Sequence, residues 1–456
     1  MSNNDVLIYS IKGAGKSSIY SNMTKYLKSS PALPSKLHLW GSLPTQTAIK
    51  DVKRTDFYPL SSIDSSDTVN FHIPKTPLQL LDKVEIYTEL RVLSATDGVP
   101  EANNPVSTVA DLSGALWRNV DVSIGSVSIT QSFDNSYAMG HFFDTVMHNG
   151  HNMKHFMWQK EGILLDEVTT KADSENTAYY PPGNAPAVNT NAKIRAERIA
   201  EGQLIAIVSD LNVSLFKQEK LLVPNIAIDI SLTKNDSGFI LLSAANNTEK
   251  VRIVKVVLQC TFVKPSDVVL NILEEILMSK NATYHADKSL LTFQNIPTGS
   301  RNPTFDNLFQ GDLPYFFYVA VQDRSAFGKD RTKNPYTFHK FSEINLMIDG
   351  VDYFPTPLKM IGDNHGIMYH ELLRSVGYIN GGDTLIGDYY LCHQVMGFDL
   401  AQDKSQNQTH LNLKRGGAVR LNITLPAPAP ANQVLMILAY YERIIEITKD
   451  REVIVI

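Results

Sequence analysis

The chain has 456 residues, of which 43% are hydrophobic and 20% are charged, and its 42 basic and 47 acidic residues give a net charge of −5. At roughly 100–200 residues per domain, this length predicts two or three domains. The longest apolar run, Val434–Tyr441, is far shorter than the roughly 20 residues of a membrane-spanning helix. The N-terminus lacks signal-peptide features, and two cysteines, Cys260 and Cys392, cannot form a disulfide framework. We therefore expect a protein that is neither secreted nor membrane-spanning.

Charge is distributed unevenly along the chain. Residues 1–50 contain six lysines and one acidic residue, Asp5, and so carry +5, which leaves −10 for the rest. A basic leader rich in serine and asparagine on an acidic body indicates an arm with a separate role, such as contact with a polyanion or an acidic neighbour. A solvated terminal tail is the alternative.

After this arm, most of the chain predicts short strands, because alternating or continuously apolar segments are separated by turn residues. In chain order the expected strands are Lys83–Leu93, Asn119–Thr130, Gln203–Phe216, Asn225–Leu232, Val251–Val263, Tyr315–Gln322, Glu343–Ile348, Ala418–Leu425 and Val434–Ile447. Helical patterns are few: Asp267–Lys280, which follows Pro265 and Ser266, Ser136–His148 and Ile367–Val376. Many short strands with few helices favour a sandwich or barrel over βαβ units.

The order of elements occurs twice. A strand–turn–strand unit containing glycine lies at Ile124–Val127 and again at Ile348–Val351, and a helical pattern follows each, from Tyr137 and from Ile367. An alternating strand and then a longer apolar strand complete each copy, starting at Ile226 and Val251 in the first and at Ala418 and Val434 in the second. The helix at Asp267–Lys280 separates the copies, so the sequence indicates a tandem duplication.

An amphipathic sheet must bury its apolar face against another layer, and about eight strands per copy suit two four-stranded sheets packed face to face. We therefore predict an all-β fold of two tandem eight-stranded jelly-roll β-sandwiches, with a short linker helix and an N-terminal arm. The expected boundaries are 1–50 for the arm, 51–265 for the first jelly roll, 266–284 for the linker helix and 285–456 for the second jelly roll. The polar inserts Asp97–Pro105 and Thr177–Ala192 are expected to form contact surfaces.

One segment resembles a phosphate-binding loop. Ser10–Ser18, SIKGAGKSS, contains glycines and a lysine after an apolar stretch. The pattern requires a glycine at position 10, where this chain has serine, and no helix or parallel α/β body is predicted to follow. We therefore favour a flexible glycine-rich arm over a nucleotide site.

Metal and catalytic motifs are incomplete. Three histidines follow a spacing that would place them on one face of a continuous helix, with a fourth upstream: His148, His151, His155 and His141. Asn149-Gly150 predicts that the helix ends between them, which favours loop histidines. His370-Glu371 begins like a zinc-protease helix, but Arg374 stands where the second histidine is needed, and no G-x-S-x-G elbow occurs.

Two further patterns indicate a role in the fold and not a functional site. Glu274-Glu275 lies on the predicted linker helix and indicates a solvated face. The aromatic run Leu313–Arg324 is too continuously apolar for an open nucleic-acid platform and predicts a core strand. We accordingly predict no enzyme, no catalytic, cofactor-binding or metal-binding residues, no cofactor and no small-molecule substrate.

Five segments carry a resemblance to a known family. They are PTQTAI at Pro44–Ile49 with DFYPL at Asp56–Leu60, Val120–Ser132 with the Tyr137 helix, Phe216–Lys234, Asn295–Phe338 and Ala439–Val455. In order and spacing the chain resembles the double jelly-roll major capsid proteins of the Polinton/adintovirus kind, in the adenovirus-hexon-like lineage. The resemblance covers roughly Leu43 to the C-terminus.

The resemblance implies a structural protein of the virion. Such proteins form homotrimers of pseudo-hexagonal outline that tile an icosahedral shell around a DNA genome, because two sandwiches in each of three chains give six similar lobes. It also implies contacts with neighbouring capsomers and with penton and minor capsid proteins, and an inward-facing basic arm that touches the genome or an inner layer. The alternative is a non-viral β-sandwich binding module, lectin-like or receptor-binding.

Relatives in this lineage often have a maturation protease that accepts a hydrophobic-x-Gly-x-Gly pattern. Ile11–Gly15 fits the pattern, and a related form occurs at Ile379–Gly382. The resemblance therefore implies a candidate trimming site in the arm between Ala14 and Gly15.

Overall fold

The computed structural model describes residues 43–100, 106–130, 135–150, 153–166, 190–244, 247–328, 330–361, 366–377, 394–405 and 410–456. The chain divides into two compact units, residues 1–47 and residues 48–456. The second unit contains the regular secondary structure discussed below. Most of the predicted arm lies outside the described residues.

The first half of the larger unit contains two antiparallel sheets of four strands. One has the order β1 (Ile49–Phe57), β10 (Lys250–Pro265), β3 (Leu80–Leu93) and β7 (Ile205–Asp210). The other has the order β2 (Thr68–Ile73), β8 (Ile228–Lys234), β5 (Trp117–Ile124) and β6 (Val127–Ser128). Apart from the β5–β6 hairpin, strands of the two sheets that follow one another in sequence alternate between the sheets, which is the connectivity of a jelly roll.

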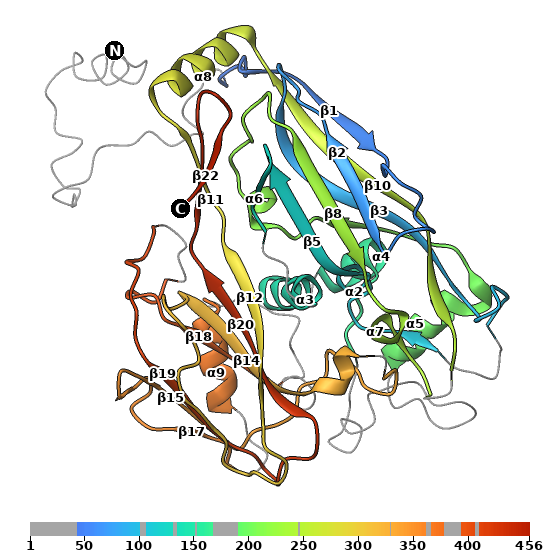
Figure 1. Cartoon of the computed structure of the whole chain (residues 1–456), viewed down its shortest axis with the longest axis vertical. Coiled ribbons are helices and arrows are strands. Elements are labelled where there is room, and N and C mark those ends of the chain that lie inside the picture. Colours follow the sequence, from blue (N-terminus) through green and yellow to red (C-terminus); the bar gives the residue numbers. More distant parts are fainter. Residues whose placement is uncertain are drawn as a thin grey trace, which may run out of the picture. The chain divides into compact units, whose positions relative to one another are not determined.

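The second half repeats this topology strand for strand. One sheet has the order β12 (Lys288–Asn295), β20 (Gln433–Tyr441), β14 (Phe316–Asp323) and β18 (Val395–Asp399). The other has the order β13 (Thr304–Phe305), β19 (Val419–Thr424), β15 (Glu343–Ile348) and β16 (Val351–Asp352), with β17 (Leu358–Lys359) paired to β15. The predicted duplication into two eight-stranded jelly rolls is confirmed (Figure 1).

Three predicted helices are present close to their expected bounds: α3 (Ser136–His148), α8 (Asp267–Ser279) and α9 (Gly366–Ser375). The side chain of Ser266 caps α8 by accepting a hydrogen bond from the amide of Val269. After α8, residues 282–284, which we assigned to the linker helix, belong to strand β11 (Ala282–His285). That strand pairs with β21 (Ile444–Ile447), which pairs with β22 (Val453–Val455).

Two predicted strands were too long. The strand expected over Gln203–Phe216 ends at Asp210, and α6 (Ser214–Lys217) replaces its last part. The strand expected over Val434–Ile447 divides into β20 and β21. At the division, the side chain of Glu442 accepts a hydrogen bond from the Asn412 amide, and that of Arg443 donates to the Ile129 carbonyl. Other elements lie outside the predicted strand and helix ranges. They are the strands β1, β2, β11, β12, β13, β17, β18 and β22 and the short elements β4 (Ser107–Thr108), α2 (Leu112–Ala115), α4 (Lys154–Glu161), α5 (Thr190–Ile199), η4 (Ala200–Gly202), α7 (Ser237–Ile240), β9 (Leu241–Leu242) and η5 (Arg324–Phe327).

The corresponding strands β3 and β14 are buried differently. Strand β3 alternates between buried and partly exposed residues, whereas in β14 every residue from Phe316 to Gln322 is buried. One face of β14 packs inside its own sandwich, and the other face meets α3 of the first sandwich, which lies between the two (Figure 1). The continuously apolar run Leu313–Arg324 is therefore a core strand, as predicted.

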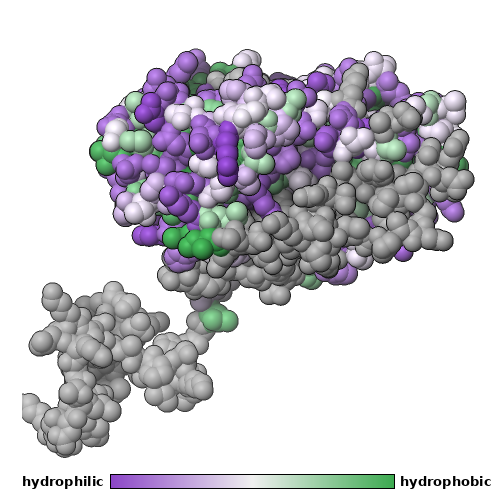
Figure 2. All heavy atoms as spheres, turned by 90° about the horizontal axis from the view of Figure 1, so that it is seen from below, coloured by the Kyte–Doolittle hydropathy of each residue, from purple (hydrophilic) through white to green (hydrophobic). Residues whose placement is uncertain are grey.

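Buried apolar side chains of both sandwiches form one continuous cluster. On the face seen in Figure 2, hydrophilic residues predominate among those described. No helix within the described ranges is long and apolar enough to cross a bilayer.

Candidate functional site

At the junction between the two sandwiches, aromatic and buried charged side chains that are far apart in the sequence come together. Its apolar part is built on α3. Phe143 is fully buried and stacks on Tyr318 of β14 with ring centroids 5.0 Å apart, and Phe142 stacks on Tyr336 at 4.3 Å. Stacked aromatic pairs each contribute about 0.5–1.5 kcal/mol beyond the area they bury. These contacts fix the orientation of one sandwich against the other.

A buried ion pair supports the same junction. Arg195 of α5 is completely buried, and its guanidinium lies 2.5 Å from an oxygen of Asp166. The guanidinium also donates to the carbonyls of Thr108 and Leu164. The second carboxylate oxygen of Asp166 accepts a hydrogen bond of 2.7 Å from the Asn334 amide of the second sandwich. Because a buried charge is tolerated only when it is paired and hydrogen-bonded, this network ties α5 to the second sandwich.

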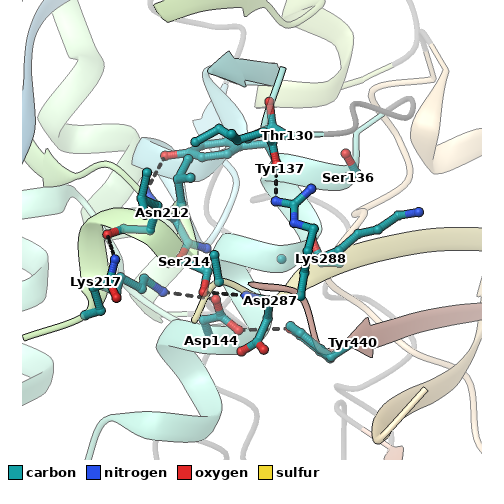
Figure 3. A pocket seen from close by; sticks show the side chains of 18 of the residues that line it. Thr130, Ser136, Tyr137, Asp144, Asn212, Ser214, Lys217, Asp287, Lys288 and Tyr440 are labelled. Atoms are coloured by element: carbon teal, nitrogen blue, oxygen red, sulfur yellow. Dashed lines mark hydrogen bonds and ion pairs between the residues drawn. The ribbon is translucent and has the colours of Figure 1, made fainter. Parts of the chain in front are cut away.

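A cavity of about 540 Å³ opens at the junction (Figure 3). Asp144 of α3 receives hydrogen bonds from Lys217 of α6, at 3.0 Å, and from the hydroxyl of Tyr440 of β20, at 2.9 Å. The backbone amide of Asp287 donates to the hydroxyl of Ser214, at 2.8 Å. Both sandwiches therefore contribute polar groups that meet in the cavity.

The two carboxylates of the cavity titrate differently. Burial favours a higher pKa for Asp144, but the Lys217 charge and its hydrogen bond outweigh it and hold the pKa below the usual range. For Asp287, burial dominates and raises the pKa to about 6, although a hydrogen bond with Tyr315 opposes the rise. One carboxylate is thus kept charged, and the other changes charge near neutral pH.

A second buried pair joins α3 to the start of α2. His141 is buried, and its Nδ1 lies 2.7 Å from Asp111, whose other oxygen caps the short helix α2. Burial by itself lowers the pKa of His141, but the charge and hydrogen bond of Asp111 outweigh it and raise the pKa above the usual value. The imidazole is a structural ion-pair partner here.

The end of the chain makes a third connection. Arg451, beside β22, donates to the carbonyl of Pro224 in the first sandwich and pairs with Glu274 of α8 at 2.6 Å. The hydroxyl of Tyr284 in β11 accepts from the Val223 amide and donates to the Leu221 carbonyl. The linker helix and the C-terminal strands therefore fasten to the first sandwich.

The structure does not bring the described candidate metal-binding histidines together. Helix α3 ends at His148, and Asn149 has an extended backbone, as predicted. His141 pairs with Asp111, His155 is exposed on α4, and His151 lies outside the described residues. Within the described ranges no group of three or more His, Cys, Asp or Glu side chains is arranged to hold a metal ion.

The other candidate motifs that fall within the described residues are not assembled into a site. His370 is exposed on α9, and Arg374 lies 3.8 Å from Glu371 in a surface ion pair. Glu275 is exposed on α8, whereas its neighbour Glu274 pairs with Arg451. Ser10–Ser18, Ile11–Gly15, Ile379–Gly382, Cys392 and most of Thr177–Ala192 lie outside the described residues.

Sequence reasoning missed the polar residues of the junction. Asp166 and Asn334 are 168 positions apart, and Asp144 and Tyr440 are 296 apart. No local spacing connects such pairs. The continuously apolar β14 was the one available signal, because a strand buried on both faces requires a second layer.

No family model matches the sequence, and no curated protein is significantly similar to it. Solved structures do match. A chain of the Sputnik virophage is 14% identical with a TM-score of 0.64, and the match covers 96% of this chain and 94% of that one. The mavirus major capsid protein is 11% identical with a TM-score of 0.56, covering 95% and 97%. The Faustovirus major capsid protein is 8% identical with a TM-score of 0.55, covering 97% and 96%.

These similarities extend over nearly the whole length of each chain. They agree with the strand order of both sandwiches, and at such low identity they establish the fold. The resemblance noted in the sequence is therefore confirmed at the level of architecture: the chain has the double jelly-roll fold of viral major capsid proteins.

Proposed function

We propose that the protein is a viral major capsid protein, which trimerises into pseudo-hexameric capsomers that tile an icosahedral shell around a DNA genome. The observation that carries the proposal is the strand-for-strand duplication. Two equivalent sandwiches per chain give six similar lobes in a trimer, and six lobes around a threefold axis fill a hexagonal lattice. On this proposal the protein is located in the virion, after assembly inside the host cell.

The fixed junction supports this role. A capsid subunit must hold both lobes in one relative orientation, because a hinge between them would vary the geometry of its contacts with neighbouring subunits. Here stacked rings, a buried ion pair and a shared apolar core join the two sandwiches. An interface of this kind disfavours relative motion of the lobes.

We propose the domain division 1–50, 51–265, 266–284 and 285–456, with the last three residues of the linker forming a strand. The +5 arm would face inward and contact the genome or an inner layer, while penton and minor capsid proteins would bind elsewhere on the shell. Salt-dependent binding of DNA to the full chain, lost on removal of residues 1–42, is the expected result. Equal binding by both forms would remove this role for the arm.

We propose that the work is structural and not enzymatic. Buried charged groups such as Asp166 and Arg195 bind groups of the protein itself. The phosphate-loop resemblance at Ser10–Ser18 can be tested directly. Neither ATP hydrolysis nor a nucleotide-induced rise in melting temperature is expected, and either result would reopen an enzymatic role.

Assembly separates this proposal from a glycan-binding or receptor-binding module, which shares the sandwich architecture. Concentrated purified protein imaged by negative-stain microscopy should form shells or hexagonal sheets. A monomer or small oligomer that binds immobilised glycans and never assembles would contradict the proposal and favour the binding module.

A further inference from the structure

The cavity at the junction has the dimensions of a ligand site. Its volume of about 540 Å³ falls in the range of roughly 300–1,000 Å³ that is typical of small-molecule sites. Residues from both sandwiches line it, including Thr130 and Ser136 from the first and Lys288 and Arg443 from the second. A ligand placed here would touch both sandwiches.

Two cations in this cavity form no ion pair with a described residue, although the charge of Asp287 acts on one of them, Arg443. Arg443 uses one terminal nitrogen to donate to the carbonyl of Ile129, while its Nε is buried without a hydrogen-bond partner among the described residues. Lys288 makes no ion pair with any described residue, whereas Lys217 is already paired with Asp144. A buried donor without a partner is costly, so a ligand in the cavity that Arg443 lines would be stabilised by accepting a hydrogen bond from it.

The unused donors suit an oxyanion. The N–H groups of Arg443 beyond the one bonded to Ile129, including Nε–H, can donate to the oxygens of a phosphate, sulfate or carboxylate. The hydroxyl of Thr130 accepts a hydrogen bond from the Val122 amide, which leaves its own hydrogen free to donate. Ser289 adds another hydroxyl to the lining.

We propose that the cavity between the two sandwiches binds a small oxyanion, held chiefly by Arg443 and Lys288. This inference goes beyond the capsid function and does not depend on it. Because Arg443 belongs to the second sandwich and already contacts Ile129 of the first, a bound anion would screen its charge and strengthen the connection between the lobes.

The affinity should rise in mild acid, because Asp287 faces the same space and loses its negative charge as the pH falls through about 6. Its titratable and charged neighbours come from every element around it: Asp144 and His148 of α3, Lys217 of α6, His285 of β11, Lys288 of β12, Tyr315 and Tyr318 at β14, Tyr440 of β20, and Glu442 and Arg443 of the following turn. Protonation of Asp287 removes the anion that competes with the ligand for Arg443.

Sulfate is the probe of choice, because it remains a dianion across the relevant pH range. Isothermal titration of the full chain should show saturable binding in about the millimolar range. Binding should weaken by about threefold or more in Lys288→Gln and about tenfold or more in Arg443→Gln, with partial recovery in Arg443→Lys. Acetate in place of sulfate tests whether a planar carboxylate is preferred.

The exposed Lys75 provides a matched control: Lys75→Gln removes the same charge outside the cavity and should bind sulfate as the wild type does. Wild-type binding should tighten between about pH 7.5 and about pH 5.5, and Asp287→Asn should abolish that difference. Absence of saturable binding, or equal weakening by Lys75→Gln and Lys288→Gln, would overturn the proposal. Near-UV circular dichroism of Lys288→Gln confirms that the fold is intact.

Discussion

The rigid junction can be tested by uncoupling Phe143 from Tyr318. Phe143 is fully buried and contacts three aromatic rings, those of Tyr318, Phe338 and Phe142. Leucine at position 143 keeps the site apolar but loses the ring contacts. At about 0.5–1.5 kcal/mol per aromatic pair, and with partial compensation by the leucine, we expect a loss of about 1–3 kcal/mol in the free energy of unfolding.

A double-mutant cycle isolates the contact between the sandwiches. Phe143→Leu combined with Tyr318→Leu should reveal a coupling energy of about 0.5–1.5 kcal/mol. Phe71 provides the control, because it is buried in the first sandwich and no ring contact with the second is described for it. The Phe71→Leu and Tyr318→Leu pair should be additive within about 0.5 kcal/mol.

The chain offers a convenient probe for this cycle. Its three tryptophans, Trp40, Trp117 and Trp158, all precede the linker helix, and Trp117 is buried in the first sandwich. Urea unfolding followed by tryptophan fluorescence therefore reports on the first half. If the sandwiches unfold as one unit, Tyr318→Leu in the second half shifts this transition. A fluorescence transition unaffected by Tyr318→Leu, with a coupling energy near zero, would refute the rigid junction.

Three further predictions concern the charged groups. Asp166→Asn should lower the free energy of unfolding by about 3–5 kcal/mol, because it leaves the buried guanidinium of Arg195 uncompensated. The control Lys193→Ala breaks the exposed Lys193–Glu197 pair on the same helix as Arg195 and should lower it by less than about 0.5 kcal/mol. Equal losses of the two variants in urea unfolding would contradict this prediction. The raised pKa of His141 contributes stability that is fully present below about pH 6.5 and is lost as the pH rises through the folded-state pKa. The urea midpoint of the wild type should therefore fall as the pH is raised across this range, and His141→Gln should lose this pH dependence. The pKa of Asp287, raised to about 6, should make the wild type gain stability as the pH falls through this value, and a wild-type profile identical to that of Asp287→Asn would remove the claim.

The main strands and the linker helix could be predicted because local sequence patterns determine them. Strands such as β8 and β19 alternate apolar and polar residues, and this period requires one buried face. Helix α8 follows a serine cap and has apolar residues at helical spacing. Repetition of these patterns in one order specified the duplication.

The missed features depend on tertiary contacts. Helix α5, NAKIRAERI after its first threonine, has little apolar character, and the buried Arg195 holds it in place through distant carbonyls and Asp166. Likewise, the division of Val434–Ile447 at Glu442 reflects hydrogen bonds from Asn412, thirty positions away. No window of sequence contains both partners of such contacts.

Two-dimensional class averages of purified particles test the central claim most directly. The chain has a mass of 50.8 kDa, and we expect particles of three times this mass that show six similar lobes around a threefold axis. Two-lobed particles with the mass of a single chain at micromolar concentration would contradict the proposed capsomer.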